Sequence, residues 1–246
     1  MVCLGEALID RLGPPGGDPA LDVSVDDRLG GAPANVACGL ARLGSDAAFL
    51  GRLGADAIGD RFATLFRRRG VDFGAVQWDA QRPSRVVLVR RGIDGERQFQ
   101  GFAGDEGRGF ADQALASVEL PMKNRWLLVG TLLLAAVASA ESLRGAIAQA
   151  KARGIALAVD VNWRPTFWDA TADPGAGPSP KAKAAIQPLL EAATLLKVSR
   201  DEALWFFASA DPAVIRAALP QRPDVVVTDG ACLLYTSPSP RDVRSS

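Results

Sequence analysis

Short apolar runs rich in β-branched residues alternate along this chain with longer segments in which apolar residues recur at helical spacing. Clear runs of the first kind lie at residues 155–161, 194–198 and 224–228. Parallel strands are buried on both faces and need crossover helices to return the chain, so this alternation is typical of a parallel sheet covered by helices. It predicts an α/β fold, with further strands at 2–9 and 125–133.

Several of the longer segments carry helix end signals. Residues 34–43 are followed by Gly44, and residues 57–69 end in three arginines before Gly70, as the helix dipole and C-cap preferences favour. Pro188 is expected to kink or end the helix that begins at Pro180. Further helices are expected over 141–153 and after Ser199 and Asp211.

Residues 85–102 break this rhythm. Two strand-like runs, 85–90 and 98–102, flank the turn sequence Gly92-Ile93-Asp94-Gly95. This pattern predicts an antiparallel hairpin inside an insertion at about 72–104 of a parallel fold.

The composition indicates the size of the fold and the kind of molecule that the protein binds. The 246 residues are 48% hydrophobic, enough for one large domain with a small appendage. Lys plus Arg equals Asp plus Glu at 28 each, so no excess charge favours nucleic acid or an anionic membrane, and we expect a small-molecule partner.

The three cysteines, Cys3, Cys38 and Cys232, are far apart and fit neither a disulfide framework nor a zinc site. No basic leader opens the sequence and no apolar run approaches about 18 residues. We therefore expect a cytoplasmic location. The sequence contains no histidine, which excludes histidine-based nucleophile systems, metal sites and general bases.

The segment from Gly30 to Gly54 is the most informative. Its start, Gly30-Gly31-Ala32-Pro33-Ala34-Asn35, combines glycines that let backbone approach a ligand, a proline that begins a helix, and an amide that can donate to and accept from hydroxyl groups. A glycine turn before a helix is the simpler explanation for the paired glycines alone. The full spacing resembles the N-terminal signature of the ribokinase-like, pfkB-type carbohydrate kinase family.

Two other segments strengthen the resemblance. Gly5-Glu6-Ala7-Leu8-Ile9-Asp10 resembles the opening strand of the family, whose terminal aspartate contacts sugar hydroxyls; alone, Asp10 would be read as a turn residue. The segment 160–168 resembles the fructokinase form of a family motif, although Val161 replaces a common proline. The resemblance implies that Arg164 holds a phosphate or substrate oxygen and that Asn162 supports the nucleotide. A plain ion pair of Arg164 with a nearby carboxylate is the alternative.

The nucleotide side is implied by three later positions. Ser199-Arg200-Asp201-Glu202 satisfies a capping box, which is a sufficient structural explanation, but it also resembles a family motif whose glutamate helps to hold water around Mg²⁺. Ser199 replaces the usual asparagine of that motif. Lys197 and the turn Thr228-Asp229-Gly230 are implied to bind ATP.

One expected motif is absent. The family places its catalytic aspartate in Gly-Ala-Gly-Asp, after the Thr-x-Gly turn, where the start of a helix stabilises the transferring phosphoryl group. No such segment follows Gly230, and neither Ala103-Gly104-Asp105 nor Gly175-Ala176-Gly177 occupies the required place. We thus expect a kinase domain at 1–231 that lacks its C-terminal part, and a disordered or non-native tail at 232–246, rich in Ser, Pro and Arg. As written, the polypeptide is expected to be poorly soluble and inactive.

Taken together, the resemblance implies a ribokinase-like three-layer α/β/α domain with a small antiparallel β lid. It implies transfer of the terminal phosphoryl group of ATP, with Mg²⁺, to a sugar, namely the conversion of fructose to fructose 6-phosphate. It also implies a homodimer contact through the lid.

A 2-keto-3-deoxygluconate kinase or a ribokinase stays open as an alternative function, since these enzymes share the scaffold. So does a sugar-binding protein without catalysis. A dinucleotide-binding oxidoreductase is disfavoured because no Gly-x-Gly-x-x-Gly follows the first strand. The residues implied to bind sugar are Asp10, Gly30, Gly31, Asn35 and Arg164; those on the nucleotide side are Asn162, Lys197, Thr228 and Gly230, with Glu202 near the metal.

Overall fold

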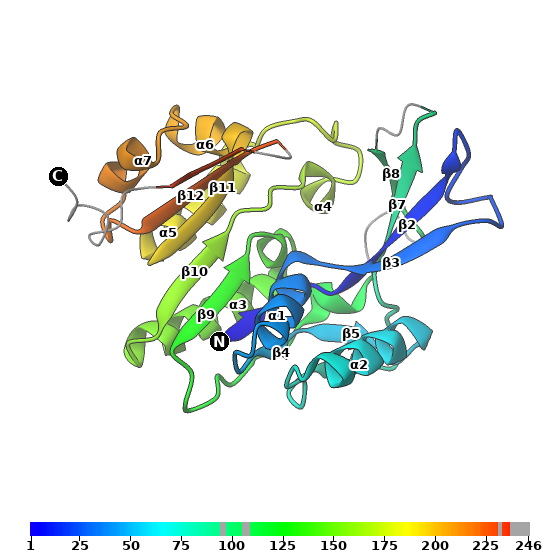
Figure 1. Ribbon diagram of the computed structural model, residues 1–246, viewed down its shortest axis with the longest axis horizontal. Coiled ribbons are helices and arrows are strands. Elements are labelled where there is room, and N and C mark those ends of the chain that lie inside the picture. Colours follow the sequence, from blue (N-terminus) through cyan, green and yellow to red (C-terminus); the bar gives the residue numbers. More distant parts are fainter. Residues whose placement is uncertain (94–96, 105–108, 231–232, 237–246) are drawn as a thin grey trace.

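The computed structural model describes residues 1–93, 97–104, 109–230 and 233–236. A seven-stranded sheet runs through the molecule in the order β13-β12-β11-β10-β9-β1-β4 (Figure 1). Neighbouring strands are parallel except for β12 and β13, so the predicted parallel sheet is confirmed. The strands are β1 (Val2–Leu4), β4 (Ala48–Leu50), β9 (Trp126–Gly130), β10 (Ala156–Asp160), β11 (Leu195–Ser199), β12 (Asp224–Asp229) and β13 (Leu233–Thr236).

Helices cover both faces of this sheet. On one face lie α1 (Ala32–Arg42) and α2 (Ala57–Arg69); on the other lie α3 (Val137–Ala152), α5 (Pro180–Ala192), α6 (Arg200–Phe207) and α7 (Pro212–Ala218). Alternate side chains of β10 pack against the two helix layers. Leu157 and Val159 belong to the core with α3 and α5, and Ala158 belongs to the core with α1 and α2. The three-layer α/β/α arrangement is therefore confirmed.

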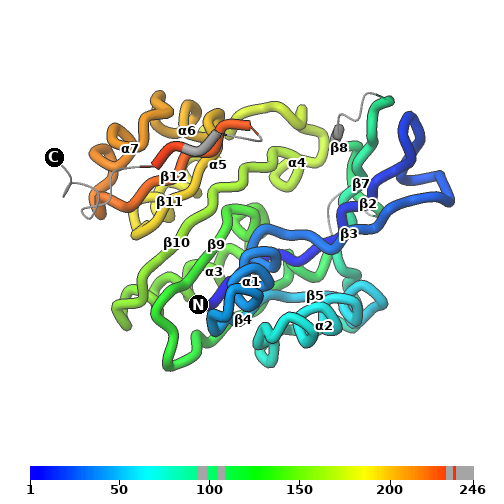
Figure 2. Tube along the Cα trace, in the orientation of Figure 1, coloured from blue at the N-terminus to red at the C-terminus, as the bar shows by residue number. Residues whose placement is uncertain are grey.

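A second, four-stranded sheet projects from the main body in the order β3-β2-β7-β8 (Figure 2). It consists of β2 (Leu8–Pro15), β3 (Asp26–Gly30), β7 (Val86–Arg91) and β8 (Arg97–Phe102). The pairs β2–β3 and β7–β8 are antiparallel, and β2 and β7 are parallel. The hairpin predicted at 85–102 thus forms, but half of its sheet comes from the N-terminal segment rather than from 72–104.

Five short elements complete the connections. A two-stranded parallel sheet joins β5 (Arg52–Gly54) to β6 (Gln77–Asp79). Two 3-10 helices, η1 (Ala111–Ala114) and η2 (Leu132–Ala135), and the short α4 (Pro165–Trp168) lie near the base of the four-stranded sheet.

Three expectations need correction. The strand predicted at 2–9 is two strands in two different sheets, because a run that is buried throughout does not reveal where the chain leaves one sheet for another. The strand predicted at 125–133 ends at Gly130 and continues as η2. Pro188, which was expected to kink or end its helix, does not end it, because the helix continues to Ala192.

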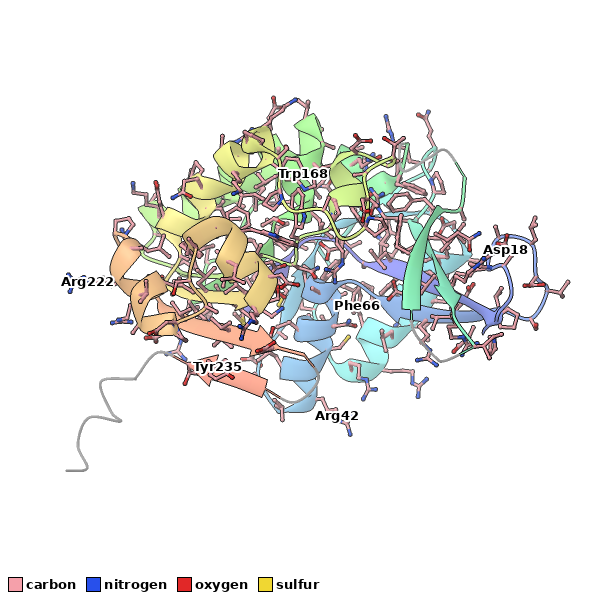
Figure 3. The ribbon with its side chains drawn as sticks, turned by 90° about the horizontal axis from the view of Figure 1, so that it is seen from above. Asp18, Arg42, Phe66, Trp168, Arg222 and Tyr235 are labelled. Carbon is pink, nitrogen blue, oxygen red and sulfur yellow. The ribbon has the colours of Figure 1, made fainter. Side chains whose placement is uncertain are left out.

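The tail from Cys232 onward was expected to be disordered or non-native. Disorder is not observed for Leu233–Thr236, which form β13 and pair with β12 in the register Val227 to Tyr235; residues 237–246 lie outside the described part of the chain, and a non-native origin of the tail stays a prediction. In Figure 3, Tyr235 marks this added strand at one end of the molecule, and Asp18 marks the loop between β2 and β3 at the other. Among the described residues, no helix is both long and apolar enough to cross a membrane.

Candidate functional site

A cleft of about 590 Å³ lies where the carboxyl ends of β1, β9 and β10 meet the four-stranded sheet. This is the edge at which open α/β sheets bind ligands. The four-stranded sheet contributes alternate residues of its strands, which share one face because side chains alternate along a strand. The cleft is lined by Glu6, Leu8, Asp10, Leu12, Arg28, Gly31, Ala32, Asn35, Val87, Val89, Phe99, Leu132, Asp160, Asn162, Arg164, Pro165, Thr166, Phe167, Pro174 and Lys197.

Asp10 faces the cleft from an unexpected element. It lies inside β2, paired with Arg28 of β3 and Val87 of β7, rather than at the end of a strand of the main sheet. Gly30 does not line the cleft but lies beside Asp10: a Cβ atom at Gly30 would be 2.6 Å from Asp10 Oδ2. Gly30 therefore leaves room for the carboxylate, instead of contacting a ligand itself.

Gly31 and Asn35 belong to the start of α1. Gly31 is the N-cap residue and has a φ of 96°, a conformation open to glycine, and a Cβ atom there would be 2.5 Å from the backbone oxygen of Glu6. Asn35 is exposed on the first turn of the helix and lines the cleft. Both predicted residues thus come together with Asp10.

The segment after β10 supplies the opposite wall. Asn162 has a φ of 43°, and Arg164 is exposed with its Nη1 donating to Trp163 O over 2.8 Å. No ion pair of Arg164 with a carboxylate occurs in the described part of the chain. The structural alternative for Arg164, a simple ion pair, is therefore without support here.

Lys197 and Asp160 connect two neighbouring strands at the floor. Their register positions are paired between β10 and β11, and Lys197 Nζ lies 2.9 Å from Asp160 Oδ1, an ion pair without the angles of a good hydrogen bond. Lys197 is 38% exposed, so its charge is available to the cleft.

Glu202 occupies a structural position. Ser199 Oγ accepts from Glu202 N, and Glu202 Oε2 accepts from Ser199 N, which completes the predicted capping box. Glu202 Oε1 accepts from Trp163 N over 2.6 Å, and the residue is 4% exposed and does not line the cleft. This geometry supports the capping explanation. The role of Glu202 in holding water around Mg²⁺ stays a prediction.

Thr228 and Gly230 lie farther along the same sheet edge. Thr228 pairs in register with Ser199, near the end of β12, and Gly230 follows with a φ of 63°. Neither lines the cleft. Adjacent strands are about 4.8 Å apart, so these residues are about two strand spacings from β10, beside the sugar-side residues rather than among them.

Glu6 was not predicted as a site residue. It lies between β1 and β2, is 2% exposed, and its Oε1 accepts from Ala32 N at 3.2 Å. Burial is the main cause that raises the pKa of its carboxyl from 4.5 to about 7; hydrogen bonds from backbone N–H groups oppose this rise, and the charges of Asp112 and Asp160 contribute to it. The sequence did contain a signal for Glu6 as a site residue, because it is a charged residue inside the otherwise apolar run 2–9.

The cations around this edge suit the phosphates of a nucleotide. Arg164 and Lys197 line the cleft, and Arg200 lies at the start of α6, where its Nη1 contacts Asp229 Oδ2 at 3.1 Å. The described residues contain no group of three or more His, Cys, Asp or Glu side chains placed to hold a metal ion. Mg²⁺ is commonly held by substrate phosphates with one or two carboxylates, so it would enter such a site together with the nucleotide.

Comparison with known proteins agrees with this geometry. A family model described as pfkB family carbohydrate kinase matches residues 1–236. Fructokinase-1 of Oryza sativa subsp. japonica is 32% identical over 212 residues, which cover 86% of this chain and 63% of that protein. Probable fructokinase-6, chloroplastic, of Arabidopsis thaliana is 28% identical over 243 residues, covering 96% and 61% respectively. The chain therefore spans about three fifths of the length of these two relatives.

A solved structure has the same architecture. The crystal structure of fructokinase with bound ATP from Xylella fastidiosa superposes with a TM-score of 0.78 at 27% identity, over 96% of this chain and 74% of that one. The family match covers nearly the whole chain, and three separately recognised motifs converge on one cleft. This chain belongs to the pfkB family of carbohydrate kinases.

Proposed function

We propose that this chain carries the sugar site, and part of the ATP site, of a fructokinase that converts fructose to fructose 6-phosphate. The carrying observation is the cleft itself: Asp10 and Asn35, which are far apart in sequence, face it together with Arg164. A carboxylate and an amide can together accept from and donate to several hydroxyl groups, which suits a polyol. The relatives reported above are named fructokinases.

In the proposed reaction, the 6-hydroxyl oxygen of fructose forms a bond to the terminal phosphorus of ATP, and the bond from that phosphorus to ADP breaks. The hydroxyl proton passes to a general base, the aspartate that the family resemblance places in a Gly-Ala-Gly-Asp motif, which the 246-residue sequence does not contain. Asp10 and Asn35 orient the sugar. Arg164 and Lys197 offset the negative charge of the phosphates, and Thr228 with Gly230 hold the nucleotide farther along the edge. ATP, with Mg²⁺, supplies the phosphoryl group.

The four-stranded sheet acts as a lid in this proposal. It supplies one wall of the cleft through Asp10, Leu12 and Val89. Closing this wall over the sugar excludes water, which would otherwise compete with the sugar hydroxyl for the phosphoryl group.

A second function has one observation in its favour. The sequence contains no Gly-Ala-Gly-Asp segment, and Asp105, which follows Ala103 and Gly104, lies outside the described residues. The chain as given would then bind sugar without phosphorylating it. Among kinases, a 2-keto-3-deoxygluconate kinase or a ribokinase would use the same cleft with different side-chain contacts.

Calorimetry and an ADP-release assay on the 246-residue chain separate these functions. We expect fructose to bind more tightly than 2-keto-3-deoxygluconate or ribose, and Asp10→Asn to weaken fructose binding by about tenfold or more, because a hydroxyl loses a charged acceptor. Asp60→Asn, an exposed carboxylate on α2, is the matched control. Fructose-dependent ADP release would favour the kinase over the binding protein, and the absence of binding to all three sugars would contradict both.

A further inference from the structure

A second cleft, of about 550 Å³, lies beside α3 and α5, and we call it the α3–α5 cleft. The short helix α4 lies between it and the cleft described above: Thr166 and Phe167 line the first cleft, Trp168 lines the second, and Pro165 borders both. A further wall comes from residues 169–179, which connect α4 to α5. Its volume is in the range of roughly 300–1,000 Å³ that is typical of small-molecule sites, so this cleft can hold a ligand of its own.

The lining of the α3–α5 cleft is largely apolar. Alanine is its most frequent residue, contributed by η2, α3, α5 and the segment 169–179, and Leu134 and Pro165 lie among the alanines. Trp168, which is half-buried, also lines the cleft, and its ring centre is 5.6 Å from that of Trp163. Short side chains leave room for a ring, and an exposed aromatic face favours stacking with another ring. The lining therefore suits a ligand with a planar, apolar body.

Two cations border this apolar lining. Arg144 of α3 and Lys181 of α5 are both exposed, and neither forms an ion pair in the described part of the chain. The carboxylate in the lining, that of Asp169, already accepts from Thr171 N and Thr171 Oγ1 at 2.9 and 2.7 Å. The cleft thus carries an excess of positive charge, which favours a ligand with a negative group.

The starts of two helices add to this positive charge. Ala136 and Val137, where α3 begins, and Ser179, the N-cap residue of α5, all line the cleft. No side chain caps α3, so the N–H groups of its first turn are not satisfied by a capping side chain. The N-terminus of a helix carries a partial positive charge and favours an anion nearby. These helix ends act in the same direction as Arg144 and Lys181.

We propose that the α3–α5 cleft is a second ligand site, which binds a planar aromatic carboxylate. The ring of the ligand packs against Trp168 and the alanines, and its carboxylate accepts hydrogen bonds from Arg144 and Lys181. The fork of arginine N–H groups matches the two oxygens of a carboxylate, and the lysine adds a point charge. The binding is noncovalent and involves neither the sugar nor ATP, so the proposal does not rest on the proposed function of the first cleft.

The experiment is calorimetric titration of 1-naphthoate, and of its uncharged counterpart 1-naphthamide, into the 246-residue chain. We expect 1-naphthoate to bind at least about tenfold more tightly than 1-naphthamide, because hydrogen bonds between charged groups are stronger than those to a neutral group. The double variant Arg144→Met with Lys181→Met keeps apolar side chains at the rim but should lose this preference. The matched control, Arg68→Met with Lys151→Met, removes two exposed charges outside the cleft and should keep it. Ala185→Phe, at a half-buried position in the wall, should weaken binding of 1-naphthoate by about tenfold or more, because its ring occupies the cleft.

The results that overturn the proposal are equally specific. Equal affinity of the unmodified chain for the two compounds, or a preference for 1-naphthoate that survives the loss of Arg144 and Lys181, shows that these cations do not hold the ligand. Binding that Ala185→Phe leaves unchanged places the ligand outside this cleft, and no binding of 1-naphthoate at about 1 mM overturns the proposal as a whole. If Ala185→Phe does not fold, as judged by circular dichroism, Ala172→Phe in the segment 169–179, which lines the same cleft, takes its place. None of these outcomes depends on sugar binding, so failure of this proposal and failure of the proposed function are distinguishable.

Discussion

Gly31 and Gly39 both belong to the segment that begins and forms α1, but only one has a conformational reason to be glycine. A Cβ atom at Gly31 would meet backbone atoms of Glu6 and Ala7 at 2.5 and 3.0 Å, whereas a Cβ atom at Gly39 would meet no atom within 4 Å. Gly31→Ala is expected to destabilise the fold by about 2 kcal/mol or more and to abolish fructose binding. Gly39→Ala is expected to stabilise it by up to about 1 kcal/mol.

Urea unfolding and calorimetry of the two variants provide the test. The close contacts of Gly31 involve backbone, which cannot rotate away as the end of a side chain can. Equal stability and equal sugar affinity of Gly31→Ala and Gly39→Ala would contradict the importance of this approach.

Glu6 also makes the stability of the fold depend on pH. Because its pKa rises from 4.5 to about 7 on folding, the folded chain retains a proton that the unfolded chain releases between these values. Stability is therefore expected to fall as pH rises through this window and to level off above it. The cost of ionising Glu6 in the fold is about 3 kcal/mol at pH 8, so Glu6→Gln should be more stable than the unmodified chain at pH 8 and similar to it near pH 4.

Thermal or urea unfolding across pH 4 to 8 measures this difference, with Glu141→Gln as the exposed control. A constant difference between Glu6→Gln and the unmodified chain over the whole range would show that Glu6 titrates normally in the fold.

The sequence predicted Asp10, Asn35, Asn162, Arg164 and Lys197 as site residues, and the structure places all five on one cleft. Their polar side chains sit at recognisable motif positions next to glycine or a strand end. Glu6 was missed because burial and an unpartnered oxygen are properties of the packed molecule. Thr228 and Gly230 do not line this cleft, because β12 lies two strands away from β10 in the sheet. The order of motifs along the sequence does not predict such a distance between two strand ends.

At the scale of elements, the buried Arg85 contacts both the base of the four-stranded sheet and elements of the main body. Arg85, which directly precedes β7, is 2% exposed and makes two hydrogen bonds to Asp112 of η1. Its guanidinium carbon lies 5.1 Å from the ring centre of Phe102 and 4.6 Å from those of Phe110 and Phe167. Phe102 ends β8 and Phe167 lies in α4, so Arg85 connects elements from three parts of the chain.

Arg85→Met is expected to destabilise the fold by roughly 3–5 kcal/mol, because Asp112 would be left buried without its partner. The double variant Arg85→Met with Asp112→Leu should recover most of this loss, since no buried charge is then left unpaired. Arg28→Gln, which removes a pair whose side chains are 53% and 45% exposed, should cost at most about 1 kcal/mol. Urea unfolding of the three variants distinguishes these outcomes, and an Arg85→Met variant as stable as Arg28→Gln would show that Asp112 finds another partner.

The sequence also predicted most elements closely, and the exceptions have physical causes. Helix α2 has the predicted bounds because an aspartate N-cap, a charged last turn and Gly70 mark its ends. Helix α3 begins at Val137, before the expected start, at a residue without a side-chain cap to mark it. The strand predicted at 2–9 divides at Gly5, Glu6 and Ala7 because both halves are buried and only tertiary packing distinguishes them.

At the scale of the whole molecule, apolar side chains gather at the tip of the four-stranded sheet. Leu21 and Val23, in the loop between β2 and β3, are 82% and 100% exposed, and Ile93, after β7, is 91% exposed. Ile93 lies near Gly16, where a Cβ atom would be 3.4 Å from its Cγ1. Exposed apolar groups of this kind favour protein contacts, which is in line with the homodimer contact that the family resemblance implies for this sheet.

We expect the chain to sediment as a dimer at tens of micromolar concentration and the double variant Leu21→Asp with Val23→Asp to sediment as a monomer. Val137→Asp, at a 77% exposed position at the start of α3, should leave the dimer intact. Sedimentation velocity of the three proteins provides the measurement. A monomeric unmodified chain, or a dimeric double variant, would exclude a dimer through the tip.

The connection between the two sheets is short, and it would be the pivot of any rotation of the four-stranded sheet relative to the main sheet. Only Gly5, Glu6 and Ala7 separate β1 of the main sheet from β2, whose eight residues extend about 26 Å from this point. A rotation of about 10° at the pivot would displace the far end of β2 by about 5 Å, close to the spacing between neighbouring strands. A small angular change at the floor of the cleft would thus move the apolar tip by about one strand spacing. In a dimer that forms through this tip, such a change in one subunit would move the surface that contacts the other subunit.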